Sequence, residues 1–292
     1  MAVKQKEKTG ILCMILASML FATGGLFIKF VPWNPLAING IRSFFGAIVI
    51  AAYMTVTHHK LKLTGTTAAG ALAYLGMTTL FVASNQLAGA ANAIVLQFTC
   101  PIWIILISWI FLHKQPSTLE WTAVAAVLFG ICCFFLDSLT PGSLLGNTLA
   151  LLSGICYALM FMQNTLADGD AISSVLLGQI LGCILLGGFV LRETIFTPSV
   201  WLAVIWLGAF QVGAAYIFFS IGTRYIHPLQ AALLTGLEPV LNPLLVAVFF
   251  HQWLSWLSLT GATVVVLSVV LYTLAAAGFL QLPVQCGSPR QE

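Results

Sequence analysis

The chain has 292 residues, of which 60% are hydrophobic and 7% are charged, and its formal net charge is +3. Soluble domains carry roughly 25% charged residues, so this composition excludes a water-soluble protein. The small net charge argues against nucleic acid as a partner. We therefore expect an integral membrane protein with the lipid bilayer as its surroundings and almost no soluble part.

Apolar runs of membrane-spanning length fill the chain. A helix needs about 20 apolar residues to cross a bilayer, whereas barrel strands alternate in segments of about ten. The runs here have the helical length, and short polar or turn-forming segments separate them. They predict an all-α, polytopic protein with ten transmembrane helices at 10–30, 36–57, 66–87, 91–112, 118–136, 143–165, 171–191, 199–221, 228–250 and 254–277.

The basic residues predict the orientation. Cytoplasmic loops carry an excess of Lys and Arg. If the N-terminus is cytoplasmic, Lys29 and Arg192 fall outside and Arg42 falls within the second helix. The other basic residues then fall inside: Lys4, Lys6, Lys8, Lys60, Lys62, Lys114, Arg224 and Arg290. This bias predicts that both termini are cytoplasmic, and we expect the membrane to be a bacterial plasma membrane.

The two halves of the chain resemble each other. Gly10 corresponds to Gly146, with an aromatic–alanine pair at the same distance behind each glycine, and Leu75-Gly76 corresponds to Leu207-Gly208. The segments 101–113 (PIWIILISWIFLH) and 239–251 (PVLNPLLVAVFFH) share proline, phenylalanine and histidine at identical spacing. Chance similarity between hydrophobic segments is the alternative interpretation.

An odd number of helices in each half makes this repeat an inverted one. With five helices per half, the second half must enter the membrane from the opposite side. We expect the first repeat at 1–139, the second at 140–280 and a free cytoplasmic tail at 281–292. Secondary transporters use such inverted repeats, because exchanging the conformations of the two halves exchanges the side to which a central site opens.

The ninth predicted helix carries a family resemblance. Its string AALLTGLEPV at 231–240, the ten helices and the 5+5 duplication resemble the drug/metabolite transporter superfamily, EamA type. The matching string in the fourth helix is AIVLQFTCP at 93–101. The resemblance implies a transporter and leaves the substrate open, because the family carries amino acids, sugars, nucleotide derivatives, amines and drugs. The first repeat departs from the pattern, with Cys100 where the second repeat has Glu238.

Glu238 is the most informative candidate for solute binding. A charge at the bilayer midplane costs about 2.5–3.5 kcal/mol, so retaining it implies a cavity, a partner or protonation. Thr235, Glu238 and Asn242 are spaced i, i+3, i+7 and therefore share one face of a continuous helix. We expect this stripe to face a central site, where Glu238 binds a cationic group or carries a proton; a helix-packing role is the alternative.

Prolines and further polar residues complete the predicted site. Pro101, Pro239 and Pro243 each lack an N–H, and we expect them to bend the fourth and ninth helices and to act as hinges, or merely as bends in packed helices. Arg42 is positioned either to attract a carboxylate or phosphate of the solute or to reach the outer headgroups. The remaining candidates for substrate binding are uncharged polar and aromatic residues within spans: Gln97, Asn85, Gln163, Tyr216 and Trp103.

The sequence gives no sign of enzymatic chemistry. We find no phosphate-binding loop and no metalloprotease or hydrolase motif, so we expect no catalytic residues, no metal, no cofactor and no ATP-driven pumping by this chain alone. Its cysteines mostly lie inside apolar runs and are interpreted as packing residues. The favoured function is a monomeric secondary transporter that exports a small polar or amphiphilic metabolite, such as an amino acid or amine, by alternating access. Transport is coupled either to a proton gradient acting through Glu238 or to no energy source at all. The alternatives are a channel-like facilitator and an integral membrane enzyme.

Overall fold

The computed structural model describes residues 2–136, 143–250 and 255–276. Within these ranges the chain is built of helices and short connections, and ten helical spans are long and apolar enough to cross a bilayer. This confirms the all-α fold with ten transmembrane helices. The predicted boundary between the repeats, the histidine match at His251 and the predicted tail lie outside the described residues.

Seven of the ten spans consist mainly of one α-helix each. Five of them are continuous: α1 (Ala2–Ile28), α2 (Pro35–Val56), α3 (Gly65–Ala88), α6 (Thr118–Phe135) and α13 (Trp256–Ala276). Two end in 3₁₀ turns: α7 (Leu144–Met162) with Gln163–Thr165, and α8 (Ala171–Leu186) with Gly187–Arg192. Several of these helices begin where the sequence supplies a side-chain oxygen that accepts from a backbone N–H of the first turn, at Asn34, Thr64, Ser117, Ser143 and Asp170.

Three spans are interrupted. The fourth span consists of α4 (Ala90–Gln97) and α5 (Cys100–Leu112), and the ninth consists of α11 (Pro228–Thr235) and α12 (Glu238–Phe250). The eighth span contains α9 (Pro198–Trp206), a π-helical segment (Leu207–Ala214) and α10 (Ala215–Tyr225). Discontinuous helices near the middle of the membrane are a common feature of transporter binding sites.

The interruptions in the fourth and ninth spans show that the predicted positions of two prolines within continuous helices were wrong. Pro101 and Pro239 were expected to bend continuous helices, but each is the second residue of a new helix. Proline is well tolerated in a first turn, because the N–H that it lacks would have no intrahelical partner there. The chain is therefore interrupted just before each proline, at 98–99 and 236–237. Pro243 lies within α12.

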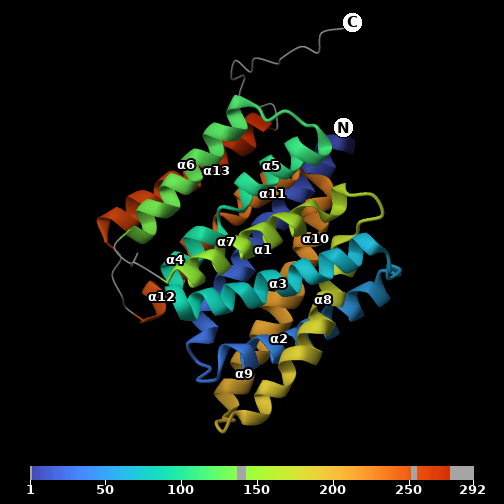
Figure 1. The fold of residues 1–292 in the computed structure, drawn as a ribbon, viewed down its shortest axis with the longest axis vertical. Coiled ribbons are helices and arrows are strands. Elements are labelled where there is room, and N and C mark those ends of the chain that lie inside the picture. Colours follow the sequence, from blue (N-terminus) through green and yellow to red (C-terminus); the bar gives the residue numbers. More distant parts are fainter. Residues whose placement is uncertain (1, 137–142, 251–254, 277–292) are drawn as a thin grey trace, which may run out of the picture.

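The bundle has two ends, and equivalent helices of the two halves run in opposite directions between them. The His59 end comprises segments 57–64, 163–170 and 226–227; the Trp33 end comprises 29–34 and 193–197. Helix α1 starts at the His59 end, where a Cβ added at Gly10 would lie 2.8 Å from the Ile226 side chain. Helix α7, its counterpart in the second half, instead finishes there, where the Thr66 hydroxyl donates to the Ala167 carbonyl. Figure 1 shows α6 and α13 side by side along one edge, away from α2, α8 and α9.

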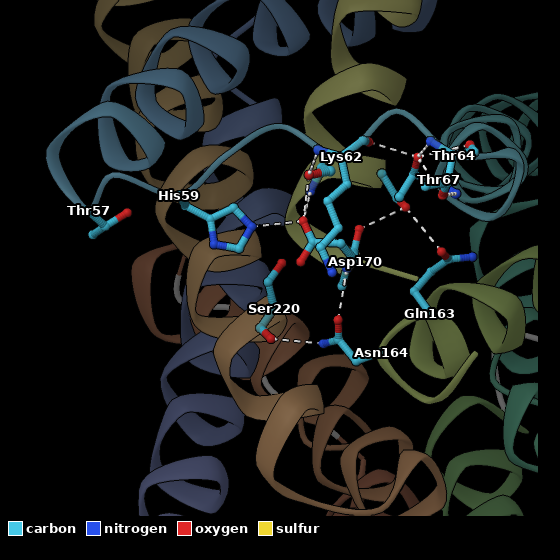
Figure 2. Close-up of polar contacts among 12 residues, drawn as sticks. Thr57, His59, Lys62, Thr64, Thr67, Gln163, Asn164, Asp170 and Ser220 are labelled. Atoms are coloured by element: carbon cyan, nitrogen blue, oxygen red, sulfur yellow. Dashed lines mark hydrogen bonds and ion pairs between the residues drawn. The ribbon is translucent and has the colours of Figure 1, made fainter. Parts of the chain in front are cut away.

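At both ends of the bundle, polar contacts join the segments that flank α2 to the segments that flank α8. At the Trp33 end the Trp33 indole N–H donates to the Ile195 carbonyl (2.7 Å), and the Asn34 N–H donates to Glu193 Oε1 (2.9 Å). At the His59 end, His59 Nε2 lies 2.9 Å from Asp170 Oδ2, as Figure 2 shows. The chain thus ties the two halves together at each membrane face.

Asp170 is ionised more readily than an ordinary aspartate. Burial of the side chain disfavours its charge, but hydrogen bonds from the Ser173 hydroxyl and N–H and the contact with His59 outweigh burial, so the pKa of Asp170 lies below its usual value. The same carboxylate caps α8. A negative charge is favourable at that position because it faces the positive end of the helix dipole.

A glycine contact brings α2 against the end of α8. A Cβ added at Gly40 would lie 2.5–2.6 Å from backbone atoms of Leu186 and Gly187. We expect Gly40→Ala to lower the melting temperature of the purified protein by several degrees, because overpacking that forces backbone to move costs about 1–3 kcal/mol. The matched control is Gly65→Ala, whose added Cβ would meet nothing within 4 Å. Equal melting temperatures for both variants would contradict the expected overpacking.

Candidate functional site

A cavity of about 460 Å³ lies between the helices of both halves. Its wall includes Ile28, Val31 and Trp33, so the cavity reaches the Trp33 end. No described wall residue belongs to the His59 end. Its polar wall residues are Asn39, Arg42, Tyr74, Thr78, Asn85, Gln86, Gln97, Tyr157, Gln211, Tyr216, Glu238 and Asn242.

Glu238 lines the cavity from the break in the ninth span. It is the first residue of α12, directly after the interruption at 236–237. A carboxylate at this position is stabilised by the unpaired N–H groups and the dipole of the helix that follows. The broken helix therefore supplies a place where a carboxylate can be kept at membrane depth.

Arg42 lines the same cavity from α2, and Asn39 holds it in place. The Arg42 Nε–H donates to Asn39 Oδ1 at 2.9 Å, which leaves the two Nη groups for other partners. Asn39 is 2% exposed and also lines the cavity, and its Nδ2 has no hydrogen-bond partner among the described residues. Two neighbouring side chains therefore present hydrogen-bond donors suited to a carboxylate or another anionic group.

The two charged groups share the cavity without pairing. Among the described residues, Arg42 and Glu238 form no direct ion pair, although they interact electrostatically across the cavity and both act on the Tyr216 ring. Charges that lack a direct partner are costly at membrane depth. A ligand that carries both signs of charge would satisfy both groups at once.

Aromatic rings form the cavity wall nearest to the His59 end. Tyr216 lies 4.9 Å from Phe21 and 5.1 Å from Tyr74, measured between ring centroids. Tyr157 approaches from α7. A solute in this cavity therefore meets both charged groups and apolar ring surface, as is usual for small-molecule sites.

The part of the cavity wall formed by α1 and α12 depends on a glycine. A Cβ added at Gly25 would collide with the Asn242 side chain. Glycine at this position lets α1 approach α12 closely enough for both Gly25 and Asn242 to line the cavity.

The structure brings together most of the residues predicted to bind solute. Glu238, Asn242, Arg42 and Pro239 line the cavity. Gln97, Asn85 and Tyr216 do so as well, although Gln97 Nε2 already donates to the Ser153 hydroxyl at 2.6 Å. Glu238 and Arg42, both candidates from the sequence, thus line the same cavity.

Four predicted residues lie away from the cavity wall. Thr235 ends α11, is fully buried and donates to the Ala232 carbonyl; the i, i+3, i+7 stripe assumed a continuous helix, and the break after Thr235 removes it from the shared face. Gln163 lies in the 3₁₀ turn after α7 and accepts from the Ser174 hydroxyl. Trp103 and Pro101 lie on α5 outside the described wall. Nothing is described of the Pro243 side chain.

Sequence reasoning missed Asn39. It precedes Arg42 by three residues, and i, i+3 neighbours share a helix face, so this spacing could have identified it. In the described part of the chain, no group of three or more His, Cys, Asp or Glu side chains is placed to hold a metal ion.

Comparisons with known proteins agree with this architecture. The model of the EamA-like transporter family matches residues 8–136 and again residues 144–274. An uncharacterized transporter of Archaeoglobus fulgidus is 23% identical over 267 residues, which cover 88% of this chain and 94% of that protein. A solved crystal structure superposes with a TM-score of 0.78 at 18% identity, covering 94% of this chain and 99% of the other, and shows the same fold.

Proposed function

Since the chain belongs to the EamA-like transporter family and is an integral, multi-pass membrane transporter, we propose that its solute is a small zwitterion such as an amino acid. The observation that carries this proposal is that Arg42 and Glu238 line one cavity without pairing with each other. The carboxylate of the solute would bind Arg42 beside Asn39, and its ammonium group would bind Glu238. Both would form charge-assisted hydrogen bonds, which are stronger than neutral ones.

The size and lining of the cavity support a small amphiphilic solute. A volume of about 460 Å³ falls in the range of small-molecule sites, roughly 300–1,000 Å³. The rings of Phe21, Tyr74 and Tyr216 and the apolar residues near them suit an apolar side chain. A simple amine would use Glu238 and leave Arg42 without a partner, so it fits the cavity less well.

The mechanism is alternating access, with the described state open to the outside. The positive-inside rule assigns the His59 end, which carries Lys60, Lys62 and Arg224, to the cytoplasm. Both termini are then cytoplasmic, and the cavity opens outward at the Trp33 end. In that state Glu238 is reached by outside protons, and its protonation would release the ammonium group. Exchange of a proton for the solute at one carboxylate yields export driven by an inward proton gradient.

Solute counterflow in proteoliposomes tests the proposal. Purified protein is reconstituted with internal unlabelled leucine, and uptake of labelled leucine is followed. We expect saturable exchange, with isopentylamine and 4-methylpentanoate, each lacking one of the charged groups, competing at least about tenfold less well. An inward proton gradient should accelerate leucine efflux.

The other candidate functions would give different results. Competition by the amine as strong as that by leucine would leave Arg42 without a role and overturn the zwitterion. Uptake that does not saturate and shows no counterflow would indicate a channel, and chemical conversion of leucine would indicate an enzyme.

A further inference from the structure

Among the described residues, the cavity wall reaches the Trp33 end and not the His59 end, and the sequence repeat shows where to look for contacts that close the His59 side. In the register that pairs Gly10 with Gly146, the helix caps Asn34 and Asp170 also pair, so the register holds from the first helix of each half to the start of the second. The residues that line the opening at the Trp33 end therefore have identifiable counterparts at the His59 end. Contacts made by those counterparts are candidates for the closure.

Contacts that exist at both ends do not distinguish an open end from a closed one. The His59–Asp170 contact belongs to this group. At the Trp33 end, Trp33 donates to the Ile195 carbonyl and the Asn34 N–H donates to Glu193 in the corresponding place, although the cavity reaches that end. These contacts join the halves in the described state and do not seal the cavity.

Asn164 differs between the two ends. Its counterpart in the repeat is Ile28, which lines the cavity toward the Trp33 end and whose side chain has no polar group. Asn164 Nδ2 donates to the Ser220 carbonyl (3.1 Å) and to the Thr223 hydroxyl (2.9 Å), both on α10, and its Oδ1 accepts from the Ala171 N–H (2.9 Å), as Figure 2 shows in part. One side chain thus fastens the end of α7 to α10 and to the start of α8.

An aromatic contact lies between the Asn164 hydrogen bonds and the cavity. Phe161 of α7 and Phe219 of α10 are fully buried, and their ring centroids are 5.0 Å apart. Each also contacts a tyrosine of the cavity wall, Phe161 with Tyr157 (4.7 Å) and Phe219 with Tyr216 (5.6 Å). The counterpart of Phe161 at the other end is Gly25, which has no side chain to fill the same space. The halves therefore differ in sequence at the positions where one end is open and the other is closed.

We infer that Asn164 is a latch that keeps the cavity closed at the His59 end. It lies on the His59 side of the Phe161–Phe219 contact, and its release from α10 admits the solute from that side. This role rests on the alternating-access mechanism proposed above. The latch consists of neutral hydrogen bonds, which are individually weak in net terms and can therefore break in each transport cycle. Separation of α7 from α10 would also part the two phenylalanine rings.

A cysteine at position 220 reports on the latch. Ser220 is 6% exposed, and it accepts from Asn164 through its backbone, so Ser220→Cys keeps that acceptor. Purified Ser220→Cys protein in detergent is treated with a hydrophilic maleimide, and mass spectrometry of peptides measures labelling at position 220. We expect slow labelling, and labelling faster by roughly fivefold or more when Asn164→Ala is added, which corresponds to the loss of two neutral hydrogen bonds.

Two further variants make the result specific to Asn164. Thr66→Ala removes the hydrogen bond to Ala167 at the same end, outside the proposed latch, and should leave the labelling rate unchanged. Thr223→Val removes one acceptor of the latch and should raise the rate by a smaller factor, which keeps the test available if Asn164→Ala fails to fold. An unchanged rate in the latch variants, or an equal rise with Thr66→Ala, would overturn the latch. Because labelling requires no solute, absence of leucine counterflow would instead refute the proposed function.

Discussion

Glu238→Gln is expected to lower the affinity for leucine by roughly 10- to 100-fold, because a hydrogen bond to a charged partner contributes about 1.5–3 kcal/mol. Glutamine has nearly the same shape, so the cavity should persist while the negative charge that binds the ammonium group is lost. Scintillation proximity binding with labelled leucine in detergent measures the affinity. Counterflow in proteoliposomes then measures the transport rate.

The same substitution should remove the dependence of transport on pH. In the unmodified protein, protons and the ammonium group compete for Glu238, so leucine binding from the open side should weaken as the pH falls. The glutamine variant has no proton to exchange at this position, and its remaining transport should not respond to an imposed proton gradient. Glu193→Gln is the matched control, since that side chain accepts from the Asn34 N–H at the Trp33 end and lies outside the cavity wall. Unchanged affinity and pH response in Glu238→Gln would rule out the proposed role.

The spans could be predicted because hydropathy and helix length are local properties of the sequence. The positions at which spans are interrupted were harder to predict. A proline lowers the stability of a helix wherever it lies in the interior, but it is equally suited to the first turn of a new helix. The sequence does not say which of these two outcomes packing selects, so Pro239 was expected to bend a helix that in fact restarts at Glu238.

The candidate site could be predicted only in part, because it is formed by helices distant in sequence. The polarity of Glu238, Asn242 and Arg42 within apolar spans indicated a buried polar site. That Arg42 and Glu238 share one cavity depends on how α12 packs against α1 and how α2 packs against α8 and the π-helical segment, which no local pattern encodes. Likewise Gln163 and Trp103 have suitable chemistry, but their positions on the tertiary fold place them outside the wall.

Arg42→Gln is expected to weaken leucine binding by roughly 10- to 100-fold while leaving the weak binding of isopentylamine unchanged. The guanidinium can bind a carboxylate through two parallel hydrogen bonds, and glutamine supplies neither the charge nor that geometry. Arg42→Lys keeps a point charge but loses the bond from Nε to Asn39, so its affinity should be intermediate.

Asn39 and a remote arginine provide the controls for this prediction. Asn39→Ala should weaken leucine binding less than Arg42→Gln, because it removes the contact that positions Arg42 and one further donor but keeps the charge. Arg224→Gln, on an exposed residue in the last turn of α10, makes the same chemical change away from the cavity and should leave the affinity as it was. An equal loss of leucine and isopentylamine binding in Arg42→Gln would show that Arg42 supports the structure of the cavity. A selective loss of leucine binding would show that it recognises the carboxylate, and together with the Glu238 result it would identify both charges of the solute.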